Sequence, residues 1–290
     1  MPSAADSPPP VRTPPTALTI AASDSSGAAG VAADLKTFAA HQVYGLLAIT
    51  ALTAQDSQAI YAVQPLPPEF IARQMRAVLT DMGADAAKTG LLFNAPTIRA
   101  VAAAFAESGF AAPLVVDPVL VAGDGRRLVD AAGLAAYREA LFPQAALITP
   151  NLTECGLLLE GAVTTAEEMS AAALALCARY NLPAVLVKGG HLPSGVMIDI
   201  LAVGGTLHHY ETPRLALDNP RGTGCTFSAA ITAELAKGTA LPDAVRLAQG
   251  YLQRALAAAV GWRLGAGRAT LWHGVDPERG RDDAALTPSP

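Results

Sequence analysis

The sequence has few cysteines, few aromatic residues and few charges for a chain of 290 residues. Its three cysteines, Cys155, Cys177 and Cys225, are widely spaced and form no CxxC pair, which argues against a disulfide framework and favours a reducing, cytoplasmic setting. No run of about twenty apolar residues occurs, so the sequence predicts no membrane-spanning helix. A net charge of −5 without a long basic run argues against a nucleic-acid partner or an anionic membrane surface.

Several common catalytic motifs are also absent from the sequence. Lys36-Thr37 and Lys88-Thr89 are not preceded by glycine, so there is no GxxxxGK[ST] phosphate loop. The sequence contains no GxSxG elbow, no HExxH helix and no GxGxxG turn. The five histidines lack metal-ligand spacing. These absences exclude the signatures of P-loop enzymes, α/β-hydrolases and zinc proteases.

What the sequence does contain is apolar: 51% of residues are hydrophobic and 16% are charged, which is typical of a compact, core-rich globule. Residues 1–16 hold six prolines and no secretory signal, so we expect a disordered leader. Residues 274–290 are rich in charge and proline, and we expect a disordered tail. No repeat and no change of composition interrupts the part between them, which predicts a single domain over residues 17–273.

Short apolar runs alternate with helical patterns along this domain. We expect strands at 17–22, 46–53, 86–92, 114–116, 146–149 and 184–187, and helices at 28–41, 67–82, 95–108, 130–141, 152–160, 165–180, 225–237 and 240–260. Two further strands, 197–203 and 206–210, flank Gly204-Gly205 as a hairpin. Non-alternating apolar strands between helices predict an α/β fold of three layers, with a mostly parallel sheet between two layers of helices.

Polar residues lie where the predicted strands end. They are Asp24, Gln55, Asp117, Asn151 and Lys188. In open parallel sheets, ligands bind beyond the carboxyl ends of the strands. The sequence therefore predicts an active site at this edge of the sheet.

Residues 219–226 form a glycine-rich turn that leads directly into a helical pattern with few charges. Glycines at a helix start let several backbone N–H groups converge on one anion. The same amides are expected to lower the pKa of the Cys225 thiol. An anion cradle beside an activated group is typical of phosphoryl transfer, whereas the alternative is a plain turn with a small buried cysteine.

Six blocks of the sequence together resemble the hydroxymethylpyrimidine and phosphomethylpyrimidine kinases of thiamine synthesis. The blocks are residues 18–38, 49–56, 117–122, 148–154, 187–191 and 222–225, in the order of that family. The resemblance covers roughly residues 17–260. It implies a ribokinase-like fold, a homodimer, and transfer of the γ-phosphoryl group of ATP to a pyrimidine hydroxymethyl group with Mg²⁺.

On the substrate side, the resemblance implies that Gln55 hydrogen-bonds the aminopyrimidine, since an amide both donates and accepts. Asp24, Asp34, Ala22 and Val119 match positions near the substrate. Simple surface exposure is the alternative for Gln55. Asp34 could equally be a solvated or helix-capping carboxylate.

On the nucleotide side, Asn151 and Glu154 match an NxxE motif that places Mg²⁺ and the phosphates. The same spacing also fits a capping box at a helix start, and the two interpretations are compatible. The resemblance implies that Lys188, Thr223 and Gly224 bind the phosphates of the nucleotide. The alternative for Lys188 is a lysine at a strand end that is exposed to solvent. Gly222, Thr223 and Gly224 form the anion cradle, and Cys225 stands where related sugar kinases have an aspartate base.

The sequence also departs from the family pattern. Ala21-Ala22 replaces Ala-Gly, and residues 27–30 read Gly-Ala-Ala-Gly where the family has Gly-Gly-Ala-Gly. Both changes are expected to narrow backbone freedom in a loop that faces the substrate. Two other functions are open: a pyridoxal or pyridoxine kinase of the same superfamily, and a non-catalytic ligand-sensing domain.

Overall fold

The structure is a computed structural model, and it describes residues 13–122, 125–190, 195–217 and 219–277. Most of the predicted leader and tail, and His191 of the resemblance, lie outside these residues. The first strand begins at Thr16, inside the predicted leader. At the other end, Arg254 donates hydrogen bonds to the backbone oxygens of Asp276 and Pro277, so the first residues of the predicted tail pack against the domain.

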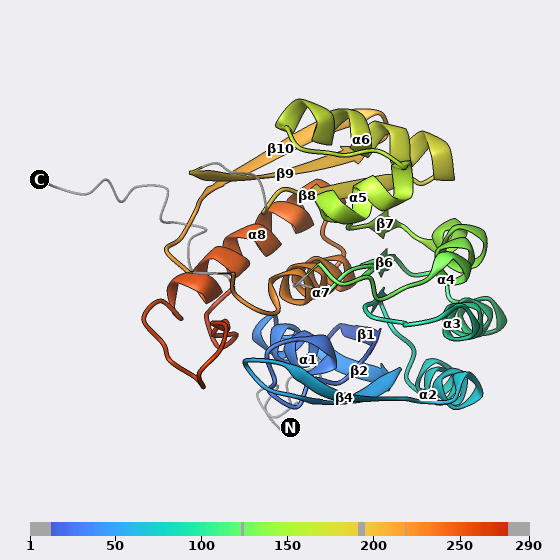
Figure 1. The fold of residues 1–290 in the computed structure, drawn as a ribbon. Coiled ribbons are helices and arrows are strands. Elements are labelled where there is room, and N and C mark those ends of the chain that lie inside the picture. Colours follow the sequence, from blue (N-terminus) through green and yellow to red (C-terminus); the bar gives the residue numbers. More distant parts are fainter. Residues whose placement is uncertain (1–12, 123–124, 191–194, 218, 278–290) are drawn as a thin grey trace, which may run out of the picture.

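One sheet of eight strands runs through the molecule (Figure 1). The order is β10-β9-β8-β7-β6-β5-β1-β2; the six strands from β8 to β2 are parallel, while β9 is antiparallel to both β8 and β10. Their bounds are β1 Thr16–Ala21, β2 Tyr44–Ile49, β5 Ala86–Thr89, β6 Leu114–Val116, β7 Leu147–Ile148, β8 Ala184–Lys188, β9 Val196–Val203 and β10 Thr206–Pro213. A separate two-stranded sheet pairs β3 (Ala51–Gln55) with β4 (Ile60–Pro65).

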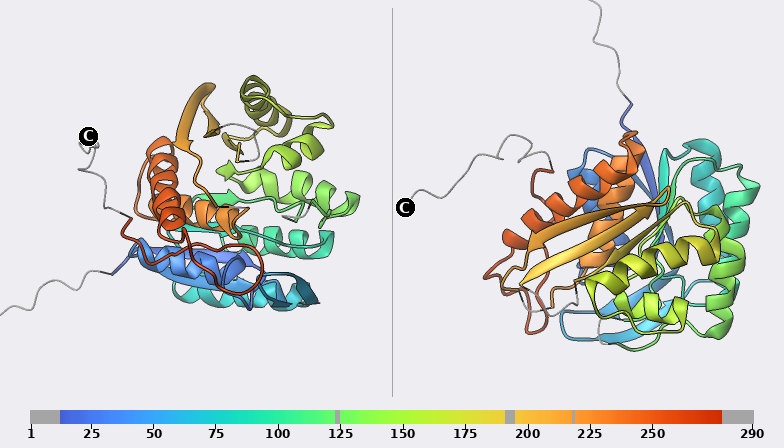
Figure 2. Two further views of the ribbon diagram at one scale, coloured as in Figure 1. Left: turned by 60° about the vertical axis from the view of Figure 1, so that its left-hand side comes forward. Right: turned by 90° about the horizontal axis from the view of Figure 1, so that it is seen from above.

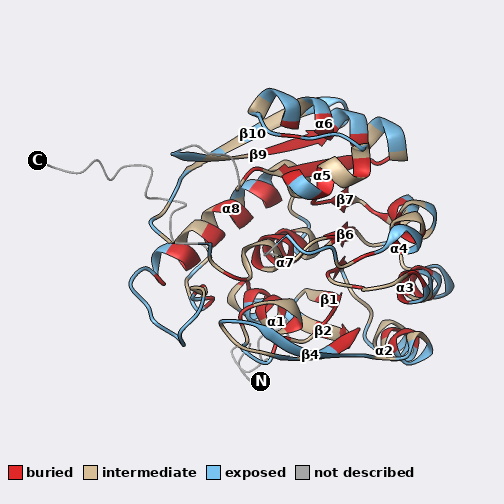
Figure 3. Cartoon of the chain, viewed as in Figure 1, coloured by how far each residue is buried: buried red, intermediate tan, exposed pale blue. Residues whose placement is uncertain are grey.

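Helices cover both faces of the large sheet (Figures 1 and 2). On one face lie α1 (Gly30–Ala40), α7 (Thr223–Ala236) and α8 (Leu241–Ala257). On the other lie α2 (Pro68–Asp81), α3 (Ala95–Glu107), α4 (Ala131–Ala136), α5 (Leu152–Leu159) and α6 (Ala166–Tyr180). The central strands and the inward faces of these helices are buried, while β4 is exposed and β10 has no buried residue (Figure 3). The predicted three-layer fold with a mostly parallel sheet and a hairpin is confirmed.

Local sequence signals explain most element boundaries. Asn94, Asp130 and Thr165 each accept a backbone N–H from the first turn of the helix that they precede. Gly204 and Gly205 have φ of 56° and 78°, which the tight turn between β9 and β10 requires. Each strand from β5 to β7 is buried at every position, in agreement with apolar runs that do not alternate.

Two predictions about elements were wrong in detail. The expected strand 46–53 is divided at Thr50, which is buried and hydrogen-bonded to the Ala21 and Leu91 carbonyl oxygens, so the chain leaves the large sheet there and continues as β3. Its partner β4 was missed. The expected helix 130–141 is α4 followed by a wider π-helical turn at Tyr137–Leu141. No helix among the described residues is long and apolar enough to cross a membrane.

Candidate active site

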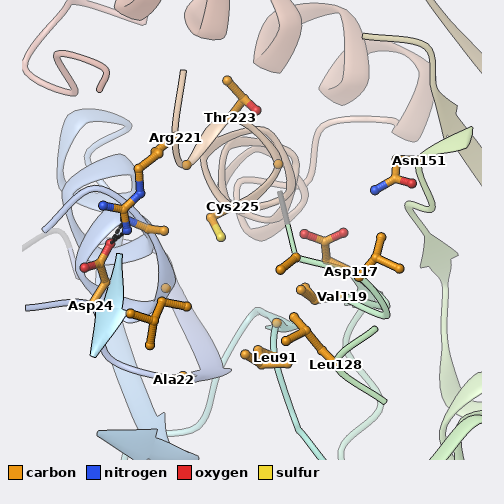
Figure 4. A pocket seen from close by; sticks show the side chains of 18 of the residues that line it. Ala22, Asp24, Leu91, Asp117, Val119, Leu128, Asn151, Arg221, Thr223 and Cys225 are labelled. Atoms are coloured by element: carbon orange, nitrogen blue, oxygen red, sulfur yellow. Dashed lines mark hydrogen bonds and ion pairs between the residues drawn. The ribbon is translucent and has the colours of Figure 1, made fainter. Parts of the chain in front are cut away.

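A cavity of about 1060 Å³ opens at the carboxyl ends of the parallel strands. Its walls include residues that follow β1, β5, β6 and β7, the last residue of β8 and the start of α7. All five strand-end residues singled out in the sequence line it. Figure 4 shows the Cys225 side chain between Asp24 and Arg221 on one side and Asp117 and Asn151 on the other. The expected location of the site agrees with this cavity.

The turn before α7 requires glycine at its first position. Gly222 is the N-cap residue with φ of 81°, and a Cβ there would collide with the carbonyl oxygen of Ala28. Thr223 and Gly224 follow as the first residues of α7, and both line the cavity. The N–H groups in the first turn of a helix have no partner within the helix, so this turn can bind an anion.

Lys188 approaches the same turn from the end of β8. Its Nζ lies 2.8 Å from Oδ1 of Asp117, and a Cβ on Gly224 would lie 3.3 Å from this Nζ. Burial alone would lower the pKa of Lys188, but the carboxylates of Asp117 and Glu154 raise it above its ordinary value. The lysine is therefore a fixed cation that faces the glycine turn. Asp117, which also accepts a hydrogen bond from Thr149, was noted as a strand end but was not assigned a role.

Asn151 and Glu154 form the capping box of α5. Oδ1 of Asn151 accepts the Glu154 N–H at 3.0 Å, and Oε2 of Glu154 accepts the Asn151 N–H at 2.8 Å. The other carboxylate oxygen of Glu154 accepts the Leu120 N–H at 3.1 Å. Burial raises the pKa of Glu154 to about 7, and the Asp117 carboxylate adds to this shift, while Lys188 opposes it. The capping interpretation holds, and both residues still line the cavity.

These residues also fit a magnesium ion. Among the described residues no three His, Cys, Asp or Glu side chains are grouped closely enough to hold a metal alone. Mg²⁺ does not need such a cage, because it keeps several waters and binds through one or two carboxylates together with phosphate oxygens. Glu154 and Asp117 supply oxygen donors at the cavity, and the raised pKa of Glu154 reflects a buried carboxyl that a cation would stabilise as the anion.

The expectation for the Cys225 thiol was wrong. Burial raises its pKa to about 11, although the nearby Lys88 ammonium and the Gly30 N–H act in the opposite direction. A helix start lowers a thiol pKa only where its effect exceeds the hydration that the thiolate loses. For this half-buried side chain, the loss of hydration outweighs both the helix start and the Lys88 ammonium. At neutral pH the group is a thiol.

The other wall of the cavity carries the residues expected on the substrate side. Gln55, at the end of β3, lines the cavity together with Ala22 and Val119. The Gln55 backbone N–H binds Ser25 Oγ at 2.7 Å, and its carbonyl oxygen accepts from the same hydroxyl at 2.6 Å. The Gln55 side-chain oxygen is 3.4 Å from Thr53 Oγ1, which leaves its amide NH₂ available to a ligand.

The matched regions agree with what the comparisons find. A model of the phosphomethylpyrimidine kinase family matches residues 24–272. The chain belongs to this family. It is 43% identical over 257 residues to the hydroxymethylpyrimidine/phosphomethylpyrimidine kinase of Rhizobium meliloti, which covers 89% of this chain and 96% of that one.

The chain is also similar to a longer bifunctional protein and to a kinase of known structure. A thiamine biosynthesis bifunctional protein of Geobacter sulfurreducens is 42% identical over 265 residues, covering 91% of this chain; the chain spans about half, 53%, of that protein's length. The structure of Bacillus subtilis pyridoxal kinase in an ADP complex superposes with a TM-score of 0.83 at 34% identity, covering 90% of this chain and 98% of that one.

The chain's departures from the family pattern carry no visible strain. The narrower backbone freedom expected at the alanines stays a prediction, while the two loop positions that need a positive φ, Gly27 and Gly30 with φ of 72° and 58°, are still glycine. A Cβ at Gly30 would collide with the Ala22 carbonyl oxygen. The alanines at positions 22, 28 and 29 have no positive φ, so an L-residue is accommodated there.

Asp24 is held in place by its own neighbours. Its Oδ1 accepts from the N–H and hydroxyl of Ser26, and its Oδ2 accepts from the Ala29 N–H at 2.9 Å and from Arg221 at 3.1 Å. Arg221 also donates to the carbonyl oxygen of Asp56. This arginine, which the sequence analysis left without a role, thereby joins the β1–α1 loop, the β3–β4 turn and the start of α7.

Asp34 lies outside the cavity, contrary to its expected place beside the substrate. It is fully buried and forms an ion pair with Lys88, with 2.7 Å between Oδ1 and Nζ. The alternatives of solvation and helix capping were also wrong. The partner is 54 residues away in the chain, and no local spacing could have indicated it.

The C-terminal segment, left without a role, closes one side of the cavity. Backbone N–H groups of Gly267 and Arg268 bind Ser57 in the β3–β4 turn, and Arg268 reaches Asn219 with its guanidinium. His273 Nε2 lies 2.9 Å from Thr226 Oγ1 in the first turn of α7. The sequence signal that could have indicated this contact is Gly267, because a Cβ there would collide with the Ser57 backbone.

Proposed function

We propose that the chain transfers the γ-phosphoryl group of ATP to 4-amino-5-hydroxymethyl-2-methylpyrimidine, and then to its monophosphate, in thiamine biosynthesis. One observation carries this proposal: the Gly222–Gly224 turn, Lys188, Glu154, Gln55 and Cys225 all line the same cavity. Within it, Cys225 lies between Asp24 and Asp117 (Figure 4). Phosphoryl transfer needs groups that bind and stabilise the phosphates, which the glycine turn, the lysine and the buried carboxyl can supply. The Gln55 amide can in addition hydrogen-bond a heterocyclic acceptor substrate.

On the substrate side, the proposed contacts are Gln55 to the aminopyrimidine and Ala22 and Val119 to the ring faces. Asp24 lines the same wall, but its oxygens already accept four hydrogen bonds. We assign it to shaping the loop that holds the ring, together with Arg221. Asp34 has no direct role because it is sealed from the cavity.

On the nucleotide side, Asn151, Lys188, Thr223 and Gly224 are proposed to hold the phosphates. A second cavity of about 460 Å³ adjoins the first and shares lining residues with it, among them Thr223 and Asn219. Besides Arg214 and Asn219, it is lined mainly by apolar side chains. These are Met197, Leu215, Leu217, Leu252 and Leu256. Such a cavity suits the faces of a purine base, so we propose that ATP binds with its base there and its phosphates toward the glycine turn.

Mg²⁺ would be held by Glu154, with Asn151 and Asp117 beside it, and would neutralise charge on the phosphates. Lys188 and the N–H groups of the glycine turn stabilise the charge that develops on the transferring group. Cys225 is the side chain placed to accept the hydroxymethyl proton. With a thiol pKa near 11 it can do so only in the small thiolate fraction, so positioning carries most of the catalysis.

A pyridoxal kinase activity is the second candidate, favoured by the close superposition on the Bacillus subtilis enzyme. Relatives that phosphorylate vitamin B6 often carry a cysteine near the Asp-Pro strand end to engage the aldehyde. Residues 118–121 here are Pro-Val-Leu-Val, which favours the pyrimidine. A ligand sensor would be expected to lose Cys225, Lys188 or Glu154, and all three are present.

We also propose a homodimer formed through the β3–β4 sheet. Leu52 and Tyr61 on this sheet and Phe70 on α2 are exposed large apolar residues, with 47%, 66% and 48% of their surface accessible. Sedimentation equilibrium of the wild type and of Leu52→Glu tests this, since a charge in the interface should give a monomer. The three free cysteines are compatible with the expected cytoplasmic location.

The test of the activity is an assay of ADP release with hydroxymethylpyrimidine, its monophosphate and pyridoxal as separate acceptors. We expect turnover with both pyrimidines and a lower kcat/KM for pyridoxal. A preference for pyridoxal of more than about tenfold, equivalent to about 1.4 kcal/mol, contradicts the assignment. No turnover with any acceptor supports the sensing function instead.

A further inference from the structure

A second lysine–aspartate pair lies behind the glycine turn and has no contact with the cavity. Lys88 on β5 and Asp34 on α1 have no exposed side-chain surface, and Thr19 on β1 donates to the remaining oxygen of Asp34 at 2.6 Å. Both carboxylate oxygens therefore accept hydrogen bonds. Burial alone would lower the pKa of Lys88, but the facing Asp34 carboxylate raises it, so the lysine stays charged.

The ammonium group of this pair lies beneath the first turn of α7. Lys88 Nζ is 3.4 Å from the carbonyl oxygen of Cys225, whose backbone follows the anion cradle. The hydroxyl of Ser228 donates to the same oxygen at 3.1 Å. Lys188 lies on the cavity side of the turn: its Nζ is the atom nearest to a Cβ added at Gly224, at 3.3 Å. The turn thus has a lysine on either side.

The fold alone gives no reason for such a pair. Replacing a buried ion pair by apolar residues of similar volume is often neutral or stabilising, because both charges lose their hydration. The neighbouring positions on the same face of β1 and β5, Ala17, Ala21 and Ala86, are apolar and buried. A charge at this depth, directed at the start of α7 that carries the Gly222–Gly224 turn, therefore points to the site and not to packing.

We propose that Lys88, held by Asp34 and Thr19, is a positioning residue that fixes the first turn of α7 and places a permanent positive charge behind the Gly222–Cys225 turn. This inference rests on the proposed kinase reaction. In that reaction, negative charge develops in front of the turn, and a charge that cannot reach solvent or substrate favours the transition state without contributing a ligand contact. The Lys88 charge also favours the thiolate form of Cys225, and its effect is larger than the opposing effect of the Asp34 carboxylate.

The test uses the double variant Asp34→Asn/Lys88→Met, which removes both charges and leaves no unpaired ion in the core. Its midpoint of urea unfolding should stay close to that of the wild type. We expect kcat to fall roughly thirtyfold, less than for a group that touches the phosphoryl, while KM for ATP and for the pyrimidine changes less than about threefold.

A second readout does not depend on the substrate. Alkylation of Cys225, followed by mass spectrometry of its peptide, measures its thiolate fraction, and Cys177 on α6 serves as the internal control. In the double variant we expect Cys225 to react several-fold more slowly, on the order of tenfold, and Cys177 to react at an unchanged rate. Glu234→Gln is the matched variant: it also removes a buried charge from α7, at the far end beside His41, and should change neither readout.

Wild-type kcat and wild-type Cys225 reactivity in the double variant would overturn the proposal, and so would failure of the double variant to fold while Glu234→Gln folds. Loss of kcat with unchanged Cys225 reactivity would also contradict the electrostatic claim. If the wild type itself phosphorylates none of the three acceptors, the proposed function fails, whereas the alkylation experiment still decides whether Lys88 acts on Cys225.

Discussion

Two lysine–aspartate pairs flank the start of α7, and they differ in what they can reach. Lys188 and Asp117 line the cavity, and 14% of the Lys188 side-chain surface is exposed. Lys88 and Asp34 are sealed on the opposite side of the turn. The first pair can contact a ligand and exchange partners with it, whereas the second can only hold a geometry and a charge. We call the side of the α7 start with Lys188 and Asp117 the reactive side, and the side with Lys88 and Asp34 the supporting side.

The largest effect should come from the reactive side. Lys188→Met removes the cation that faces the glycine turn, and we expect kcat to fall on the order of a thousandfold. The unfolding free energy should fall by less than the about 3 kcal/mol expected for a sealed pair, because Asp117 lines the cavity and keeps its hydrogen bond from Thr149. Steady-state kinetics and urea unfolding check the two parts. A kcat within tenfold of the wild type would remove Lys188 from the transfer step.

On the supporting side, a single substitution should affect stability most. Lys88→Met leaves the Asp34 carboxylate buried without its cation, and we expect the unfolding free energy to fall by about 3 kcal/mol. Urea unfolding beside Lys188→Met measures the contrast directly. Equal losses in the two variants would mean that burial does not distinguish the pairs.

A third support of the same turn should be visible in the pH dependence of stability. Burial lowers the pKa of His273, which contacts Thr226, from 6.5 to about 4. The unfolded chain binds a proton in this window and the folded chain does not, so stability should fall by roughly 2 kcal/mol as the pH decreases from 6.5 to 4. Thermal unfolding of the wild type and of His273→Gln measures it; the variant should have a flatter profile. An identical slope in both would assign the acid sensitivity to other groups.

The smallest expected effect belongs to the cysteine between the two pairs. Cys225→Ala should retain substrate binding and lower turnover at least tenfold, about 1.4 kcal/mol. Because burial raises the pKa of the thiol to about 11, wild-type kcat should increase between neutral pH and about pH 10 if the thiolate accepts the proton, and the variant should lack this increase. Near-wild-type turnover of the variant leaves Cys225 a packing role.

The reactive side could be predicted from the sequence because its residues end strands. Asn151 and Lys188 follow buried apolar runs, and parallel strands place their carboxyl ends at one edge. The Gly222 turn was also predictable, since glycine marks a backbone conformation that other residues rarely adopt.

The supporting side could not be predicted in this way. The Asp34–Lys88 and Asp24–Arg221 pairs join residues that are 54 and 197 positions apart, and neither has a spacing that a local pattern could reveal. The pKa of Cys225 was predicted in the wrong direction for the same reason: the helix start is visible in the sequence, but the burial that dominates the shift arises only in the folded structure. Local chemistry predicts positions, whereas tertiary packing decides protonation.

We propose that the γ-phosphoryl group of ATP is transferred to a pyrimidine in the cavity at this turn. Phosphorus NMR of a mixture of the protein, ATP, Mg²⁺ and hydroxymethylpyrimidine tests it most directly, because it identifies the product and not only the ADP. We expect a resonance of the pyrimidine monophosphate to appear first. The two coupled resonances of a pyrimidine diphosphate should then replace it. Accumulation of inorganic phosphate alone, or phosphorylation of pyridoxal but not of the pyrimidine, would contradict it.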